Sequence, residues 1–274
     1  MPLGLRTNIA SLNVQKNVNS TQDSLAASYN KVSSGERITT AADDAAGLAI
    51  SESMKSKIRS YVVAERNAND AVSMTQTAEG ALGEMHDVLG RMRELAMQSS
   101  NGTYSATDRD NIQQEFDALR TEMDRIKQST TFNGVSLMSA TAAPVTFQVG
   151  LTADSNDQVA VNFQELDLTG LMSATLAGSD STNALASLQV IDDAIQNISN
   201  QRASFGAAMN RLAVVTNNIQ TIRVNLTAAN SRIRDTDVAQ EMSNISSKQV
   251  QSQAGVAMLA QANQLTQAVL GLLK

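Results

Sequence analysis

The chain has 274 residues and a net charge of −6, with 3% aromatic residues, one His and neither Cys nor Trp. The lack of Cys excludes a disulfide scaffold, a thiolate metal site and a cysteine nucleophile. A single His excludes a His-cluster metal site, and the acidic balance argues against non-specific nucleic-acid binding. Charged residues make up only 18%, so the polar surface is mainly Ser, Thr, Asn and Gln. Such a surface suits a protein that is covered largely by copies of itself.

The chain contains no apolar run long enough to cross a membrane. Its first eight residues lack the basic region and the following apolar region of a secretory signal. We therefore expect no membrane insertion and no cleaved signal. The chain is expected either in the cytoplasm or exported by a route that reads no cleavable signal.

Apolar and small residues recur at alternating spacings of three and four, which is the pattern of long helices packed side by side. The pattern occupies residues 14–32, 74–95, 112–126, 188–219 and 258–272. It predicts a mainly α fold: an elongated antiparallel helical bundle or coiled coil formed by the N- and C-terminal halves, with a small β-hairpin insert. The seam that joins the two ends of the chain is expected to use Val14, Val18, Leu25, Val32, Met258, Leu265, Val269 and Leu272.

Three breaks divide the N-terminal half. Residues 33–35 end the first helix, because Gly35 can adopt the left-handed conformation of a helix C-cap. Asp43 or Asp44 can then cap the next helix. That helix runs from about residue 44 to 100 and is about 80 Å long. A turn follows, and the third helix is expected to begin near Thr107 and Asp108.

The middle of the chain changes character. Apolar and polar residues alternate over 145–149 and again over 159–163, with a turn-rich stretch between them. This pattern predicts a β-hairpin within about residues 140–165. Residues 166–180 are expected to form a loop.

The two ends of the chain, up to about residue 35 and after about residue 235, are amphipathic. An isolated helix is only marginally stable in water. We expect these segments to become ordered against each other and against neighbouring copies of the chain.

No nucleotide-binding, zinc-protease or serine-hydrolase motif occurs in the sequence. Asp43 and Asp44 are adjacent, so their side chains do not converge on a helix, and a capping role accounts for them. His86 has no second His with which to hold a metal. Arg91, Arg93 and Glu94 form a charged face that is either simply solvated or a docking patch. We therefore predict no enzymatic activity, no metal and no cofactor.

Several motifs together resemble bacterial flagellins. They are SSGERITTAADDAAGLAI at 33–50, RNANDA at 66–71, TAEGAL at 77–82, RMRELA at 91–96, TFNG at 131–134, NSRI at 230–233 and AQANQ at 260–264. The resemblance covers about residues 1–138 and 185–274, and the region between is much shorter than in many flagellins.

The resemblance implies an inner coiled-coil domain formed by 1–34 with 240–274. It implies connecting segments at 35–43 and 235–239, and a helical rod domain at 44–234. It also implies a structural protein without enzymatic activity, which is exported unfolded by the flagellar type III apparatus. Outside the cell it would polymerise into the helical flagellar filament for swimming.

By the same resemblance, the partners are further copies of the chain, an export chaperone at the C-terminal tail, and the filament cap and hook-junction proteins. The animal Toll-like receptor for flagellin is a further implied partner. Its contacts in the family resemble Arg91, Leu95 and Glu115, on a surface that also serves subunit packing. Arg234 and Val238 depart from the family pattern, which often has an acid and Tyr at these positions.

Two alternatives remain open at this stage. One is a hook–filament junction protein of the same superfamily, which would be present in few copies. The other is a secreted coiled-coil adhesin, which would form a stable soluble dimer and no filament.

Overall fold

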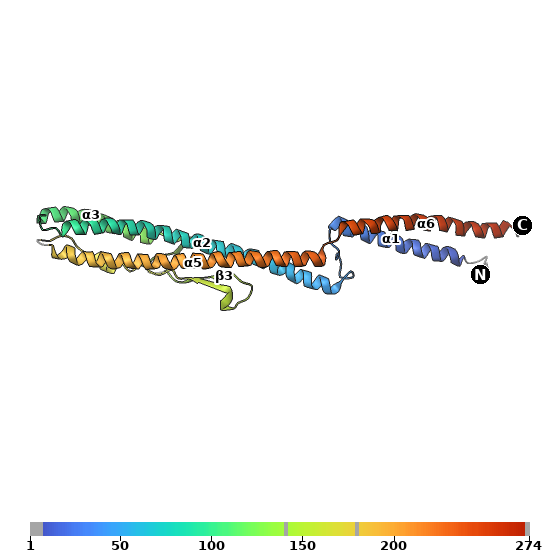
Figure 1. The fold of residues 1–274 in the computed structure, drawn as a ribbon, viewed down its shortest axis with the longest axis horizontal. Coiled ribbons are helices and arrows are strands. Elements are labelled where there is room, and N and C mark those ends of the chain that lie inside the picture. Colours follow the sequence, from blue (N-terminus) through green and yellow to red (C-terminus); the bar gives the residue numbers. More distant parts are fainter. Residues whose placement is uncertain (1–7, 140–141, 179–180, 272–274) are drawn as a thin grey trace. The chain divides into compact units, whose positions relative to one another are not determined.

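The structure is a computed structural model that describes residues 8–139, 142–178 and 181–271, with residues 265–271 described by their backbone alone. The chain forms two compact units (Figure 1). The terminal unit comprises Met1–Ile58 and Val224–Lys274, and the central unit comprises Arg59–Arg223. The division falls inside helices α2 (Ala45–Ser99) and α5 (Thr182–Arg234), whereas the sequence places domain boundaries near residues 44 and 234. Among the described residues, no helix combines the length and hydropathy that a membrane crossing requires.

The terminal unit pairs α1 (Ile9–Ser34) with α6 (Val238–Gly271). The pair is antiparallel, because the side-chain amide of Asn8 donates to the carbonyl of Ala262 at 3.0 Å. At the other end of α1, Gln249 donates to the hydroxyl of Tyr29 at 2.6 Å. Gly35 ends α1 in the left-handed conformation with φ of 72°, as the sequence predicts.

The two helices approach closely where Gly255 of α6 faces Val18 of α1. A Cβ atom on Gly255 would lie 2.6 Å from Cγ2 of Val18. Since a Val side chain has little rotamer freedom, only glycine at this position lets the backbone of α6 come so near. The contact therefore fixes the register of α1 against α6.

The central unit holds the closed apolar core. Residues 59–99 of α2, helix α3 (Ala106–Ser129) and residues 182–223 of α5 pack around it. Phe163 and Phe205 lie against each other in this core with ring centroids 5.4 Å apart. The largest fully buried side chains of α2, α3 and α5 are Leu82, Met85, Leu89, Met92, Leu95, Phe116, Met123 and Phe205.

Local signals set the helix ends around this core. Ser105 caps α3 through a capping box with Asp108, so the helix begins at Ala106, one residue before Thr107, near which the sequence predicts the start. The guanidinium of buried Arg109 donates to the carbonyl of Ser99 at 3.0 Å. It thereby satisfies a backbone acceptor at the C-terminal end of α2 that has no partner within the helix.

The β insert is confirmed, with more structure around it than the sequence predicts. The strands β3 (Val145–Gln148) and β4 (Gln158–Val161) pair antiparallel in the expected stretch. A second small pair, β1 (Thr131–Phe132) with β2 (Val135–Ser136), precedes it. The expected loop at 166–180 contains the short helix α4 (Thr169–Ser173), because Leu171 packs into the core and is 1% exposed.

Leu95 and Met97 provide a matched test of this core, since they are two residues apart on α2. Leu95 is 2% exposed and Met97 is 52% exposed. We expect Leu95→Ala to lower the free energy of unfolding by about 2–5 kcal/mol. Met97→Ala is expected to change it by less than about 0.5 kcal/mol. Denaturant unfolding followed by circular dichroism measures both, and equal effects would contradict the assignment of the core.

Candidate assembly surfaces

Two of the three residues in the expected packing and receptor patch meet on the surface of the central unit. Arg91 of α2 forms ion pairs with Glu115 of α3 at 2.8 Å and with Glu94 at 2.9 Å. The hydrogen bond to Glu94 is the largest cause of a raised pKa for Arg91, and the hydrogen bond to Glu115 is the second. All three side chains are exposed, so another molecule can reach them.

Leu95, the third residue, lies elsewhere. Its side chain is part of the apolar core and is 2% exposed. The sequence places it beside Arg91 on one helical turn, but α2 turns this position toward the packed interior. The Leu95 side chain is therefore not part of the exposed surface that carries Arg91 and Glu115.

A neighbouring arginine on α2 is bound by a different helix, and the sequence offers no signal for this. The side chain of Arg93 pairs with Asp192 of α5 at 2.6 Å. Consequently Arg91 ties α2 to α3 while Arg93 ties α2 to α5. Both pairs are exposed, so each adds little to stability and mainly fixes the orientation of the side chains.

The predicted seam between the chain ends is only partly buried. On α1, Val18 is 9% exposed, and Val14, Leu25 and Val32 are half-buried. On α6, Met258 is 60% exposed. The side chains of Leu265 and Val269, and all of Leu272, lie outside the described residues.

The terminal unit leaves many apolar side chains in solvent. In α1 the buried residues are Val18 and Ser28, and in α6 Ile245 is the apolar side chain that reaches full burial among those described. The large exposed apolar residues of these two helices are Ile9, Leu12, Tyr29, Val238, Met242, Val250, Val256 and Met258. These exposed side chains make the two helices a candidate interaction surface.

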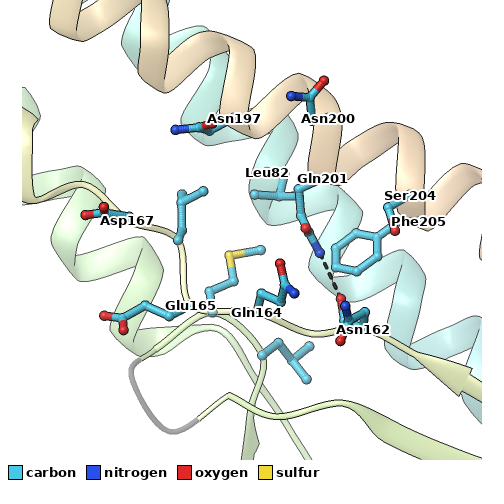
Figure 2. Close-up of a pocket in the computed structure, with 13 residues that line it drawn as sticks. Leu82, Asn162, Gln164, Glu165, Asp167, Asn197, Asn200, Gln201, Ser204 and Phe205 are labelled. Carbon is cyan, nitrogen blue, oxygen red and sulfur yellow. Dashed lines mark hydrogen bonds between the residues drawn. The ribbon is translucent and has the colours of Figure 1, made fainter.

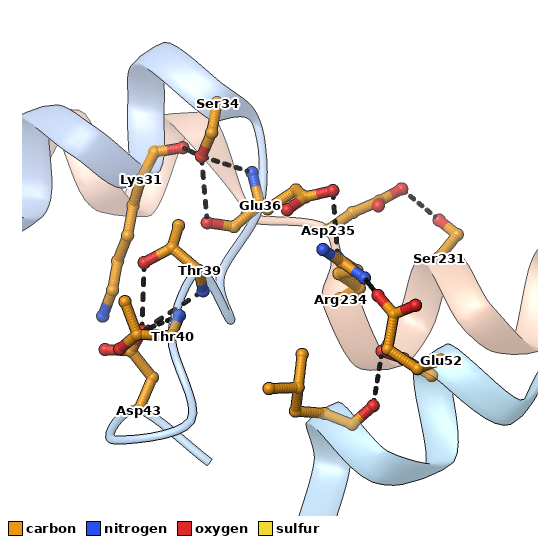
Figure 3. Close-up of polar contacts among 12 residues, drawn as sticks. Lys31, Ser34, Glu36, Thr39, Thr40, Asp43, Glu52, Ser231, Arg234 and Asp235 are labelled. Carbon is orange, nitrogen blue, oxygen red and sulfur yellow. Dashed lines mark hydrogen bonds and ion pairs between the residues drawn. The ribbon is translucent and has the colours of Figure 1, made fainter. Parts of the chain in front are cut away.

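The two connecting segments are held together within the terminal unit by Arg234 (Figure 3). Its guanidinium pairs with Glu36 at 2.9 Å and with Glu52 of α2. These bonds raise the pKa of Arg234, with the hydrogen bond to Glu52 as the largest cause. The backbone N–H of Arg37 donates to the carbonyl of Arg234, and that of Thr236 donates to the carbonyl of Gly35. Arg234 is thus the centre of the connection.

Asp43 and Asp44 have separate structural roles. Asp44 accepts a hydrogen bond from the N–H of Gly47 at 2.8 Å, which confirms it as the cap of α2. Asp43 accepts four bonds, from the N–H and hydroxyl groups of Thr39 and Thr40. Those bonds lower the pKa of Asp43 from 3.8 to about 2, and the bond from the N–H of Thr40 is the largest cause. Asp44 therefore fixes the start of α2, and Asp43 fixes the turn before it.

A cavity of about 420 Å³ opens in the central unit between α2, α5 and the segment after β4 (Figure 2). Its walls carry carboxamides, and Gln201 donates across it to the carbonyl of Asn162 at 2.9 Å. Of the carboxylates that line it, Glu165 is paired with Lys127 at 3.1 Å.

Within the described residues, no group of three or more His, Asp or Glu could hold a metal ion. His86 is half-buried, and its Nδ1 has no hydrogen-bond partner in the described part of the chain.

The low pKa of Asp43 predicts a pH-dependent contribution to stability. Because the folded pKa lies below 3.8, the contribution is present above about pH 4 and is lost as the pH falls toward about 2. We expect Asp43→Asn to lower the thermal midpoint at neutral pH, and the difference from the parent chain to vanish between pH 4 and 2. Asp70→Asn, at an exposed carboxylate of α2, is the control. A difference that persisted unchanged to pH 2 would contradict the hydrogen bonding described.

Comparison with known proteins identifies the family. The model of the bacterial flagellin N-terminal helical region matches residues 5–143, and that of the C-terminal helical region matches residues 188–273. The chain is 43% identical to a flagellin of Halalkalibacterium halodurans over 97% of its own length and 98% of the relative. It is also 43% identical to a flagellin of Bacillus subtilis, with the same coverage. The crystal structure of Bacillus cereus flagellin aligns with a TM-score of 0.51 and 35% identity, covering 60% of this chain and 94% of that chain. The chain therefore belongs to the bacterial flagellins.

Proposed function

We propose that copies of the chain assemble through the terminal unit, whose exposed apolar side chains are buried by neighbouring copies. As a flagellin, the chain is a structural subunit of the extracellular bacterial flagellar filament. The observation that carries the proposal is the burial pattern of α1 and α6, in which residues such as Ile9 and Val250 are 67% and 65% exposed. Covering each such side chain contributes about 1.5–3 kcal/mol to assembly.

Within the filament, we assign residues 1–34 and 240–274 to the inner core and residues 44–234 to the rod domain. The antiparallel contact of Val18 with Gly255 supports the pairing of the two chain ends. The Arg234 cluster supports residues 35–43 and 235–239 as the connecting segments. A subunit that contacts different neighbours through different surfaces builds an open helical polymer when the rotation between neighbours does not close.

The proposal includes passage through the flagellar type III export apparatus in an unfolded state. The sequence contains no Cys, so no disulfide opposes unfolding. The exposed apolar side chains of α6 give an export chaperone a surface to cover at the C-terminal tail. The filament cap and hook-junction proteins are the further partners of this proposal, and no enzymatic activity is proposed.

The alternative functions are not favoured. The flagellins of Halalkalibacterium halodurans and Bacillus subtilis match over nearly their whole length. A junction protein would be present in few copies, and a secreted coiled-coil adhesin would form a stable soluble dimer and no filament.

Val250 of α6 tests the assembly surface. It is 65% exposed, so Val250→Asp leaves the free chain folded but places a charge in the subunit contact. We expect the critical concentration for seeded filament growth to rise at least about tenfold, equivalent to about 1.4 kcal/mol. Gln253→Asp, an exposed polar position on the same helix, is the matched control for charge. Filaments of Val250→Asp that grow at the parental critical concentration would refute the surface.

We further propose that Arg91 and Glu115 form the surface by which the animal Toll-like receptor for flagellin recognises the free subunit. Their ion pair presents a fixed arginine and a fixed carboxylate on adjacent helices. Leu95 is left out of this contact because its side chain is buried.

An Arg91→Glu variant is expected to lower receptor activation by the monomer about tenfold, the effect of losing about 1.4 kcal/mol of binding. The control is Arg125→Glu, since Arg125 forms a similar exposed pair with Glu122 at 2.6 Å on α3. Dose–response curves in receptor-expressing cells provide the measurement. Equal losses for both variants would show that the response follows charge in general and not this patch.

A further inference from the structure

The methionines of this chain fall into two groups that differ in access to solvent. Met242 and Met258 of α6, in the terminal unit, are 48% and 60% exposed. Met97 and Met172 are the exposed methionines among the described residues of the central unit. Five other methionines of the central unit are buried in its core. The thioether sulfurs of α6 are therefore open to reagents in solution, and those of the core are not.

Exposed thioethers are the groups of this chain that a peroxide oxidises first, because the sequence contains no Cys. The sulfur donates an electron pair to one oxygen of hydrogen peroxide, and the O–O bond breaks. The products are methionine sulfoxide and water, so the sulfur loses two electrons and the peroxide gains them. The reaction turns a flexible apolar side chain into a polar one that accepts hydrogen bonds.

Met242 and Met258 lie on opposite flanks of the face by which α6 packs on α1. That face includes Ile245, which is buried, and Gly255, which approaches Val18. At about 100° per residue, Met242 is turned about 60° from Ile245 in one direction, and Met258 about 60° from Gly255 in the other. A neighbouring copy that covers either flank of the helical pair therefore contacts one of the two sulfurs.

A sulfoxide on either flank would place a polar oxygen in an apolar contact between copies. Burying a polar group without a hydrogen-bond partner opposes association. A reduced methionine at the same position favours association instead, because its thioether adapts to the shape of the surface that it meets. The oxidation state of these two side chains thus changes the free energy of adding a subunit.

We propose that Met242 and Met258 are oxidation sites of the free subunit, that their sulfoxides weaken its addition to a filament, and that assembly protects the reduced sulfurs from peroxide. The inference rests on the proposed assembly of copies through the terminal unit. It makes that surface sensitive to oxidants before a subunit is incorporated and insensitive afterwards.

Peroxide treatment of the free subunit, removal of the peroxide and growth from unoxidised seeds test the inference. Peptide mass spectrometry measures the conversion of each methionine. Conversion of Met242 and Met258 is expected to raise the critical concentration for seeded growth at least about tenfold. Treatment with methionine sulfoxide reductases A and B is expected to restore the parental value, because the two enzymes reduce the two sulfoxide epimers.

Leucine at both sites removes the sulfur and keeps an apolar side chain of similar volume. After peroxide treatment, the M242L/M258L variant is expected to grow within about twofold of its untreated critical concentration. Met97→Leu is the matched control, since Met97 is as exposed but lies in the central unit. Its growth is expected to stay as sensitive to peroxide as that of the parent. Equal sensitivity of M242L/M258L and the parent, or rescue by Met97→Leu, would overturn the inference.

Preformed filaments give a second readout. Met242 and Met258 are expected to oxidise much more slowly in filaments than in free subunits, and equal rates would contradict the protection. A parent chain that is oxidised at both sites and still grows at its untreated critical concentration would overturn the inference alone. An untreated parent chain that forms no filament from seeds would instead overturn the proposed function.

Discussion

Within one chain, the terminal unit leaves many of its apolar side chains exposed to solvent. The proposed assembly of the chain depends on this exposure. Helices α1 and α6 pair along their length, yet each has few fully buried residues among those described. An isolated helical pair with so little burial is marginal in water. We propose that other copies bury the remaining apolar surface, which would couple order in the terminal unit to polymerisation.

The central unit, in contrast, buries a large apolar core without help from another copy. Its core of Leu, Met and Phe side chains from α2, α3 and α5 is closed within one chain. Exposed ion pairs such as Arg93 with Asp192 orient its surface but contribute little to its stability. The unit can therefore present these ion-paired charges before any neighbour arrives. The Arg234 cluster belongs to the terminal unit and joins the segments that lead into its paired helices.

Local signals in the sequence predict most of the secondary structure. Heptad spacing predicts the long helices, Gly35 and Asp44 mark two helix ends, and alternation over 145–149 predicts β3. These features depend on neighbouring residues. The short helix α4 is missed because it is stabilised by burial of Leu171 against distant residues.

The surface contacts are harder to predict. Leu95 follows Arg91 by one helical turn, yet tertiary packing buries one and exposes the other. The partners of Arg93 and Arg234 lie 99 and 182 or more positions away in the chain, so no local pattern reveals them. Family resemblance supplies the function, while the structure shows which of the expected residues a partner can touch.

Hydrogen exchange of backbone amides, compared between free subunits and filaments, tests the coupling of order to assembly most directly. The account predicts rapid exchange of α1 and α6 in the free subunit and strong protection of both in the filament. The amides of α2, α3 and α5 in the central unit are expected to be protected in both states. Strong protection of α1 and α6 in the free subunit would show that the terminal unit folds within one chain, which would contradict the account.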